Sequence, residues 1–106
     1  MWALLNPLNT VIISEGVKTI GKDAFFRCNP QTVYLPSSVT SIGEDAFYYC
    51  ESLTSIKIPE GVTSIGASAF NGCKSLTSIK IPDGVTRIGG GAFWDCHSLT
   101  SIKIPE

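Results

Sequence analysis

Ser64–Thr86 reads SIGASAFNGCKSLTSIKIPDGVT, and this stretch decides the fold because the chain repeats it. Ser41–Thr63, SIGEDAFYYCESLTSIKIPEGVT, is identical to it at 17 of 23 positions. Arg87–Glu106 begins a further copy, and Thr19–Thr40 is a more divergent copy that is one residue shorter. A period of about 20 to 29 residues is typical of a solenoid, in which each repeat forms one rung and packs against its neighbours.

Residues 1–106 are predicted to form one domain. Its repeats are a partial copy at 1–18, complete copies at 19–40, 41–63 and 64–86, and a partial copy at 87–106. In this alignment Leu5 takes the position of Cys50, and Leu8 takes that of Leu53. Both ends fall inside a repeat and lack the polar capping unit that solenoids normally carry. Two explanations stay open: a segment of a longer array, or an end-to-end homodimer that covers the terminal rungs.

Within each repeat, the pattern of apolar residues changes. Ile56 and Ile58 alternate with polar residues, which indicates a strand with one buried face. Pro59 ends this strand because it has no N–H to donate. A turn then leads to a second short extended segment at 62–65.

The rest of the repeat is predicted to be a short helix of at most two turns, followed by the next strand. Ala46, Phe47, Cys50 and Leu53 have the spacing of one helical face, and Asp45 suits a helix N-terminus. Identical crossovers give parallel strands and, by their general preference, a right-handed solenoid. We therefore expect an α/β solenoid whose main sheet has about five strands, with columns of equivalent apolar residues as its core.

The recurring pattern A-F-x-x-C-x-S-L-T-S-I-x-I-P-x-G-V-T-x-I-G resembles the BspA-like leucine-rich repeats of bacterial and protist surface proteins, over essentially the whole chain. The resemblance implies a curved solenoid with a concave parallel sheet, in an exported protein that mediates attachment or protein binding. It implies an extracellular or cell-surface location and no catalytic residues. Ser14 and Pro30 depart from the pattern, and we expect a local distortion near Pro30, which falls close to the Leu53 position.

Composition and motifs exclude several classes of function. The net charge of −1 gives no reason to expect a nucleic-acid partner. Membrane insertion is not expected, because no apolar run approaches about 20 residues. The N-terminus MWALLNPLNT lacks the basic region of a signal peptide. Paired carboxylates at a cleft, a phosphate loop and a nucleophile–base set are all missing, so we predict no enzyme and no cofactor.

The cysteines and the single histidine are interpreted as structural and surface residues. Cys28, Cys50, Cys73 and Cys96 are spaced by the repeat period, not as a pair of metal ligands, so we predict buried free thiols and no metal site. Disulfides or a metal are the alternatives. His97 stands where other copies carry other polar residues, so we predict a solvated side chain.

The first candidate binding surface is the solvent side of the concave sheet. Leucine-rich repeats usually bind their ligands there, and a cationic strip beside an apolar patch would suit an acidic partner. The alternative is that the lysines only keep an exposed sheet soluble. The candidate residues are Ile12, Tyr34, Lys57, Lys80 and Lys103.

The second candidate surface is the helix side, where an aromatic residue follows the recurring Phe in three of four copies. Exposed aromatic residues often anchor interfaces, although here they could instead lean onto the neighbouring rung. The candidates are Phe26, Tyr48, Tyr49 and Trp94. Together the two surfaces predict a non-catalytic interaction or adhesion module that binds a protein or a glycan. The alternative is an architectural spacer with no ligand of its own.

Overall fold

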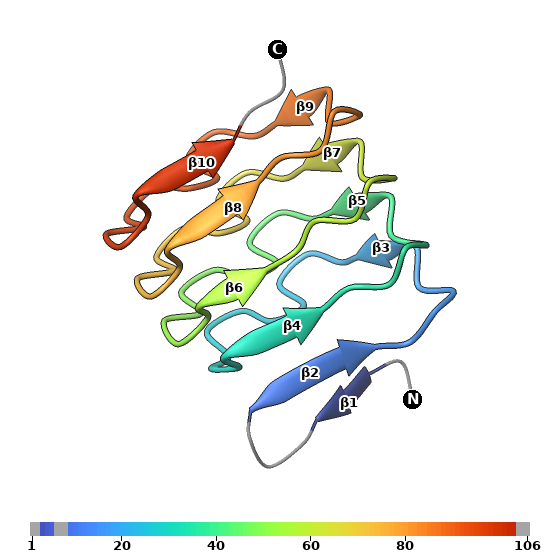
Figure 1. Cartoon of the computed structure of the whole chain (residues 1–106), viewed down its shortest axis with the longest axis horizontal. Coiled ribbons are helices and arrows are strands. Elements are labelled where there is room, and N and C mark those ends of the chain that lie inside the picture. The colour runs from blue at the N-terminus through green and yellow to red at the C-terminus, as the bar shows by residue number, and fades with distance from the viewer. Residues whose placement is uncertain (1–2, 6–8, 104–106) are drawn as a thin grey trace.

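The computed structural model describes residues 3–5 and 9–103, and within this part the chain forms short strands and turns without a helix. One series of strands, the strand face, follows one side of the molecule (Figure 1): β2 (Thr10–Ile13), β4 (Thr32–Tyr34), β6 (Ser55–Ile56), β8 (Ser78–Lys80) and β10 (Ser101–Lys103). The other series, the second face, lies behind it: β3 (Thr19–Ile20), β5 (Ser41–Ile42), β7 (Ser64–Ile65) and β9 (Arg87–Ile88).

The ladders between these strands are parallel and follow the repeat register. On the strand face, Val11 pairs with Val33, and on the second face Ile42 pairs with Ile65. The predicted parallel-strand solenoid is therefore confirmed. The strand face is not one sheet of about five strands, however: it consists of β1-β2-β4-β6 and a separate β8-β10 pair. This break follows β6, which is only two residues long.

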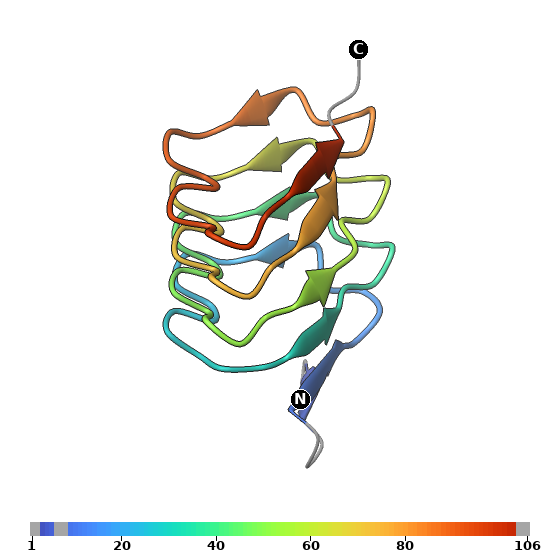
Figure 2. The same ribbon diagram turned by 60° about the vertical axis from the view of Figure 1, so that its left-hand side comes forward.

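The N-terminal segment does not continue the repeat. β1 (Ala3–Leu5) runs antiparallel to β2 and places Leu4 opposite Ile12 (Figure 2). Asn9 has a left-handed φ of 60° just before β2, a conformation that Asn tolerates better than most residues. The alignment of Leu5 with Cys50 is therefore wrong, because β1 covers the sheet edge that a preceding rung would use. Leu8 lies outside the described residues.

The predicted short helices are turns instead. The segments 22–27, 44–49, 67–72 and 90–95 stack to form what we call the turn face (Figure 2). Each segment contains two residues with left-handed φ, four positions apart, whereas a helix needs an unbroken right-handed run. These pairs are Asp23 and Arg27, Asp45 and Tyr49, Ser68 and Gly72, and Gly91 and Asp95.

Hydrogen bonds between rungs explain why the turns replace a helix. The Phe47 N–H donates to the Ala69 carbonyl at 2.8 Å, and the Tyr49 N–H donates to the Asn71 carbonyl at 2.7 Å. The Tyr48 N–H between them closes a turn within its own rung. Alternate N–H groups thus bond to the next rung, where a helix would have used them internally.

Equivalent apolar residues stack into the predicted columns. Phe25, Phe47, Phe70 and Phe93 form a ladder with ring centroids 5.2, 5.2 and 5.4 Å apart and nearly parallel planes. The alternation in the repeat strand is also confirmed, since Ile56 is buried on the side away from solvent. Burying each such side chain contributes about 1.5–3 kcal/mol. The core therefore exists only where rungs are stacked.

The spacing between rungs depends on glycines that close the second-face strands. A Cβ at Gly43, Gly66 or Gly89 would lie 2.9, 2.5 or 2.3 Å from the backbone of the preceding rung. Real Cβ atoms do not approach that closely, so only glycine fits these three positions. Gly21 holds the same position in the first of these rungs and has open space around it.

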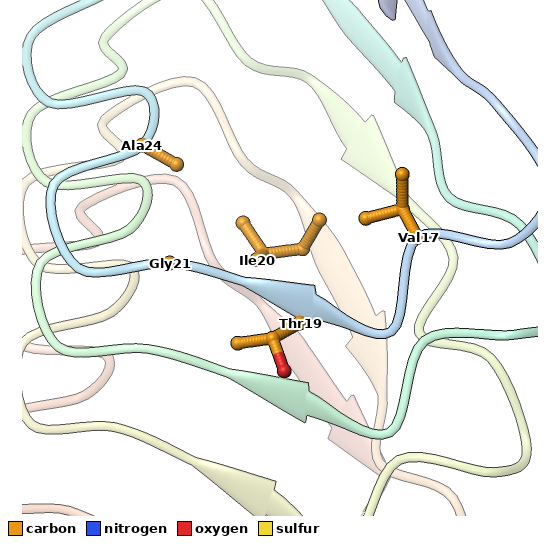
Figure 3. A pocket seen from close by; sticks show the side chains of 5 residues that line it. All are labelled: Val17, Thr19, Ile20, Gly21 and Ala24. Atoms are coloured by element: carbon orange, nitrogen blue, oxygen red, sulfur yellow. The ribbon is translucent and has the colours of Figure 1, made fainter. Parts of the chain in front are cut away.

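The N-terminal end of the second face contains a depression of about 160 Å³ (Figure 3). Ile20 and Ala24 point into it, in the direction where a preceding rung would contribute its core, whereas Thr19 points away. The two faces thus differ at this end. β1 covers the edge of the strand face, and the edge of β3 has no strand beside it among the described residues.

Candidate interaction surfaces

The strand face brings the first set of candidate residues together on successive rungs. Ile12 and Tyr34 occupy paired positions on β2 and β4, and 45% and 57% of their surfaces are exposed. Lys57 and Lys80 follow on the next two rungs and are exposed. Lys103 pairs with Lys80 through the backbone of β10, and its side chain lies outside the described part of the structure.

Two shallow depressions lie on the strand face beside these residues. One has a volume of about 290 Å³ and is lined by residues that include Tyr34 and Lys57. The other, of about 280 Å³, lies between β6 and β8 and includes Lys57 and Lys80. Both are lined in part by Ser55, Ile56 and Lys57, so the two depressions adjoin each other on the strand face. Among the described residues, no ion pair involves Lys57 or Lys80.

The second set of candidate residues lies on the turn face, but not all of these residues contact one another. The Phe26 ring stacks on the Tyr48 ring with centroids 4.9 Å apart, and Tyr48 contacts Tyr49 at 4.7 Å. Trp94 is 72% exposed, compared with 41% for Phe26. Asn71, which is buried, holds the position between Tyr48 and Trp94 in this column. Phe26, Tyr48 and Tyr49 therefore form one cluster, and Trp94 lies apart from it.

Tyr49 serves the fold more than it serves the surface. Its ring lies against Gly72, where a Cβ would be only 2.4 Å from a ring carbon. Its hydroxyl donates to Asp95 Oδ2 at 3.4 Å, two rungs further along. Asp95 also accepts from His97 Nε2 at 2.9 Å, and the His97 side chain is 68% exposed, as predicted for a surface residue. Tyr49 thus links three rungs.

Sequence reasoning missed Arg27. Its guanidinium carbon lies 5.7, 5.8 and 5.0 Å from the ring centroids of Phe26, Tyr48 and Tyr49, within the range of cation–π contacts. The Nζ atom of Lys74 lies 5.4 Å from the centroid of the same Tyr49 ring. Arg27 and Tyr49 occupy equivalent positions in the repeat, and this alignment is the sequence signal that could have placed Arg27 beside the aromatic residues.

The cysteines are free thiols, and the buried-column prediction holds for part of the set. Cys50 and Cys73 are fully buried, Cys96 is half-buried, and Cys28 is exposed. The prediction is wrong for Cys28 because the short copy omits a residue just after it, and the described residues contain no rung on its outer side. Burial raises the pKa of Cys50 to about 12, with a smaller contribution from the neighbouring Cys28 thiol.

Each later thiol also bonds to the rung before it. The Sγ of Cys50 donates to the Phe25 carbonyl at 3.0 Å, and the Sγ of Cys73 donates to the Phe47 carbonyl at 3.2 Å. Cys96 makes the equivalent bond at 3.1 Å. The cysteines therefore join rungs.

The described part of the chain contains no group of three or more His, Cys, Asp or Glu side chains that could hold a metal ion. The described residues also contain no helix with the length and apolar character needed to cross a membrane.

Known leucine-rich repeat proteins are similar to this chain in sequence and in fold. The family model of the BspA type leucine rich repeat region matches residues 4–106 in six copies. No curated protein sequence matches at a significant level. Among solved structures, a leucine-rich repeat protein from Bacteroides capillosus is 26% identical, with a TM-score of 0.77, covering 98% of this chain and 93% of that chain.

Two further solved structures are similar. The T. pallidum leucine rich repeat protein is 26% identical with a TM-score of 0.73, covering 97% of this chain and 68% of that chain. A leucine rich cell surface protein from Faecalibacterium prausnitzii is 27% identical with a TM-score of 0.63, and the match spans 97% of this chain and 40% of that one. The chain belongs to the BspA-type leucine-rich repeat family.

Proposed function

We propose that the chain is a non-catalytic protein-interaction module that acts at a cell surface, with the strand face as its binding site. Leucine-rich repeat proteins generally serve as interaction modules, and a similar structure is described as a cell surface protein. The observation that carries the proposal is that Ile12 and Tyr34 are exposed on the strand face and are followed on the next rungs by Lys57 and Lys80, which form no ion pair among the described residues. Tyr34, Lys57 and Lys80 also line the two depressions.

These residues favour an acidic partner that also offers an apolar contact. Tyr34 supplies a large, rigid and exposed contact surface of the kind that anchors interfaces. Lys57 and Lys80 attract negative charge, which favours encounter and orientation more than tight affinity. An adhesion role at the cell surface follows if the partner belongs to another surface.

The second candidate function is an architectural spacer with no ligand of its own. The regularity of the strand face favours it, because Ser-Ile-Lys-Ile-Pro recurs unchanged from Ser55, Ser78 and Ser101. Small serines and solvated lysines at recurring positions supply solubility without specificity.

Calorimetric binding of a random copolymer of glutamate and tyrosine separates these functions. We expect the double variant Lys57→Ser/Lys80→Ser to bind about tenfold more weakly, since each exposed charge contributes up to about 1 kcal/mol. The control variant Lys18→Ser/Lys22→Ser removes the same charge away from the strand face and should bind normally. Equal weakening of both variants, or no binding by the unchanged protein, contradicts the proposal.

A further inference from the structure

Arg27 is exposed on the turn face, and the described part of the chain provides no acidic partner for it. The described ion pairs involve Lys22, Lys74 and His97, with Glu44, Glu51 and Asp95 as their partners. Lys74 also lies near the aromatic cluster, but Glu51 Oε2 is 3.4 Å from its Nζ. Of the two cations at this cluster, Lys74 is paired with a carboxylate, whereas Arg27 has no ion pair with any described carboxylate.

The aromatic rings hold Arg27 in place. Its guanidinium carbon lies within 5.8 Å of three ring centroids, those of Phe26, Tyr48 and Tyr49. Tyr49 is itself fixed by its contact with Gly72 and its bond to Asp95. A guanidinium that stacks on rings uses its flat face, and its N–H donors at the edge keep the geometry that binds a carboxylate through two parallel hydrogen bonds.

Phe26 provides an apolar surface beside this donor. One face of its ring stacks on Tyr48 with an interplanar angle of 9°, and 41% of the residue remains exposed. Its neighbour Arg27 is the next residue in the chain. The exposed cation and the exposed ring can therefore contact one ligand together.

We propose that Arg27 and Phe26 form a second binding site for an acidic segment of another protein that presents a carboxylate next to an aromatic or apolar group. The carboxylate accepts from the Arg27 guanidinium, and the apolar group packs on Phe26. The site is on the turn face and involves none of the strand-face residues, so it does not depend on the function proposed above.

Titration of the ¹⁵N-labelled full chain with N-acetylphenylalanine tests this site, because that probe joins a carboxylate to an aromatic ring. We expect saturable shifts of the Phe26, Arg27 and Tyr48 amides. Arg27→Gln should weaken binding at least about tenfold, the loss expected for a hydrogen bond to a charged group. Arg87→Gln is the matched control, since it removes an exposed arginine from β9 and should leave binding unchanged.

Two other results would overturn the site. One is equal binding of N-acetylphenylalaninamide, which lacks the carboxylate; the other is unchanged binding by both Arg27→Gln and Phe26→Ala. Shifts confined to Ile12 and Tyr34 would place the probe on the strand face and would also contradict this inference. Lys57→Ser/Lys80→Ser should leave the turn-face shifts intact, so failure of either proposal is distinguishable from failure of the other.

Discussion

Residues with left-handed φ decide how each rung folds. Asp45 and Tyr49 both adopt this conformation, at φ of 57° and 53°. Such a residue other than glycine costs about 1–2 kcal/mol. The cost is offset because the two reversals direct alternate N–H groups to the neighbouring rung and bring the Tyr49 ring onto Gly72.

The four thiols should differ in reactivity according to their burial. We expect a maleimide reagent at pH 8 to modify Cys28 rapidly and Cys50 and Cys73 only when the protein unfolds. Burial holds the Cys50 pKa near 12, so the reactive thiolate is scarce in the folded protein. Mass spectrometry of peptides from timed reactions measures the order, and simultaneous modification of the three would contradict the buried column.

The same pKa shift has a consequence for stability. The folded pKa of Cys50, about 12, lies above its value in an unfolded chain, about 8.5. The unfolded state therefore loses its proton first as the pH rises. The contribution of the buried Cys50 thiol to the free energy of unfolding is complete below about pH 8.5, and it is lost progressively as the pH rises toward 12.

The strands of each rung could be predicted from the sequence, but the turn segments could not. Alternation at Ile56 and Ile58 and the stop at Pro59 specify a strand locally. The spacing of Phe47 and Cys50 fits either a helix or a double turn, because the choice depends on hydrogen bonds to other rungs. A local signal did exist: the first left-handed position of each turn segment is Asp23, Asp45, Ser68 or Gly91, and Asp and Gly tolerate that conformation better than most residues.

The close approach of rungs predicts a difference between equivalent glycines. Gly66→Ala should destabilise the protein by about 2–4 kcal/mol, because its Cβ would lie 2.5 Å from the backbone of the preceding rung, which can only move away. Gly21→Ala is the matched control and should change stability by less than about 0.5 kcal/mol, since nothing lies within 4 Å. Urea denaturation compares them, and equal costs would contradict the rung spacing.

Considered as a whole, the molecule shows which parts of the candidate sites a sequence can reveal. Periodicity identified Ile12, Tyr34 and the lysines as one column, because equivalent positions must stack. Arg27 was missed because its contacts cross between rungs and depend on side-chain geometry. The N-terminal segment was misaligned because β1 reverses direction, which a search for repeats does not detect.

The exposed core at the C-terminal end predicts self-association. Ile88 is 42% exposed, although its equivalents Ile42 and Ile65 are each 1% exposed, and Ile102 is 38% exposed. Because β1 covers an edge at the other end, we expect two copies to join through their C-terminal ends. Sedimentation should show a concentration-dependent dimer that Ile88→Lys abolishes. Ile12→Lys, which changes an exposed residue of the strand face, is the control, and a monomer at all concentrations would contradict this prediction.

The central claim is that Tyr34, the aromatic exception in a column of lysines, anchors the partner on the strand face. Tyr34→Lys tests it most directly, because it installs the residue of the equivalent positions Lys57 and Lys80 at an exposed site and adds positive charge. Calorimetry with the copolymer of glutamate and tyrosine should show binding about tenfold weaker with unchanged stability, as expected when an interface anchor is lost. Unchanged or tighter binding would show that charge alone attracts the polymer, and would contradict the claim.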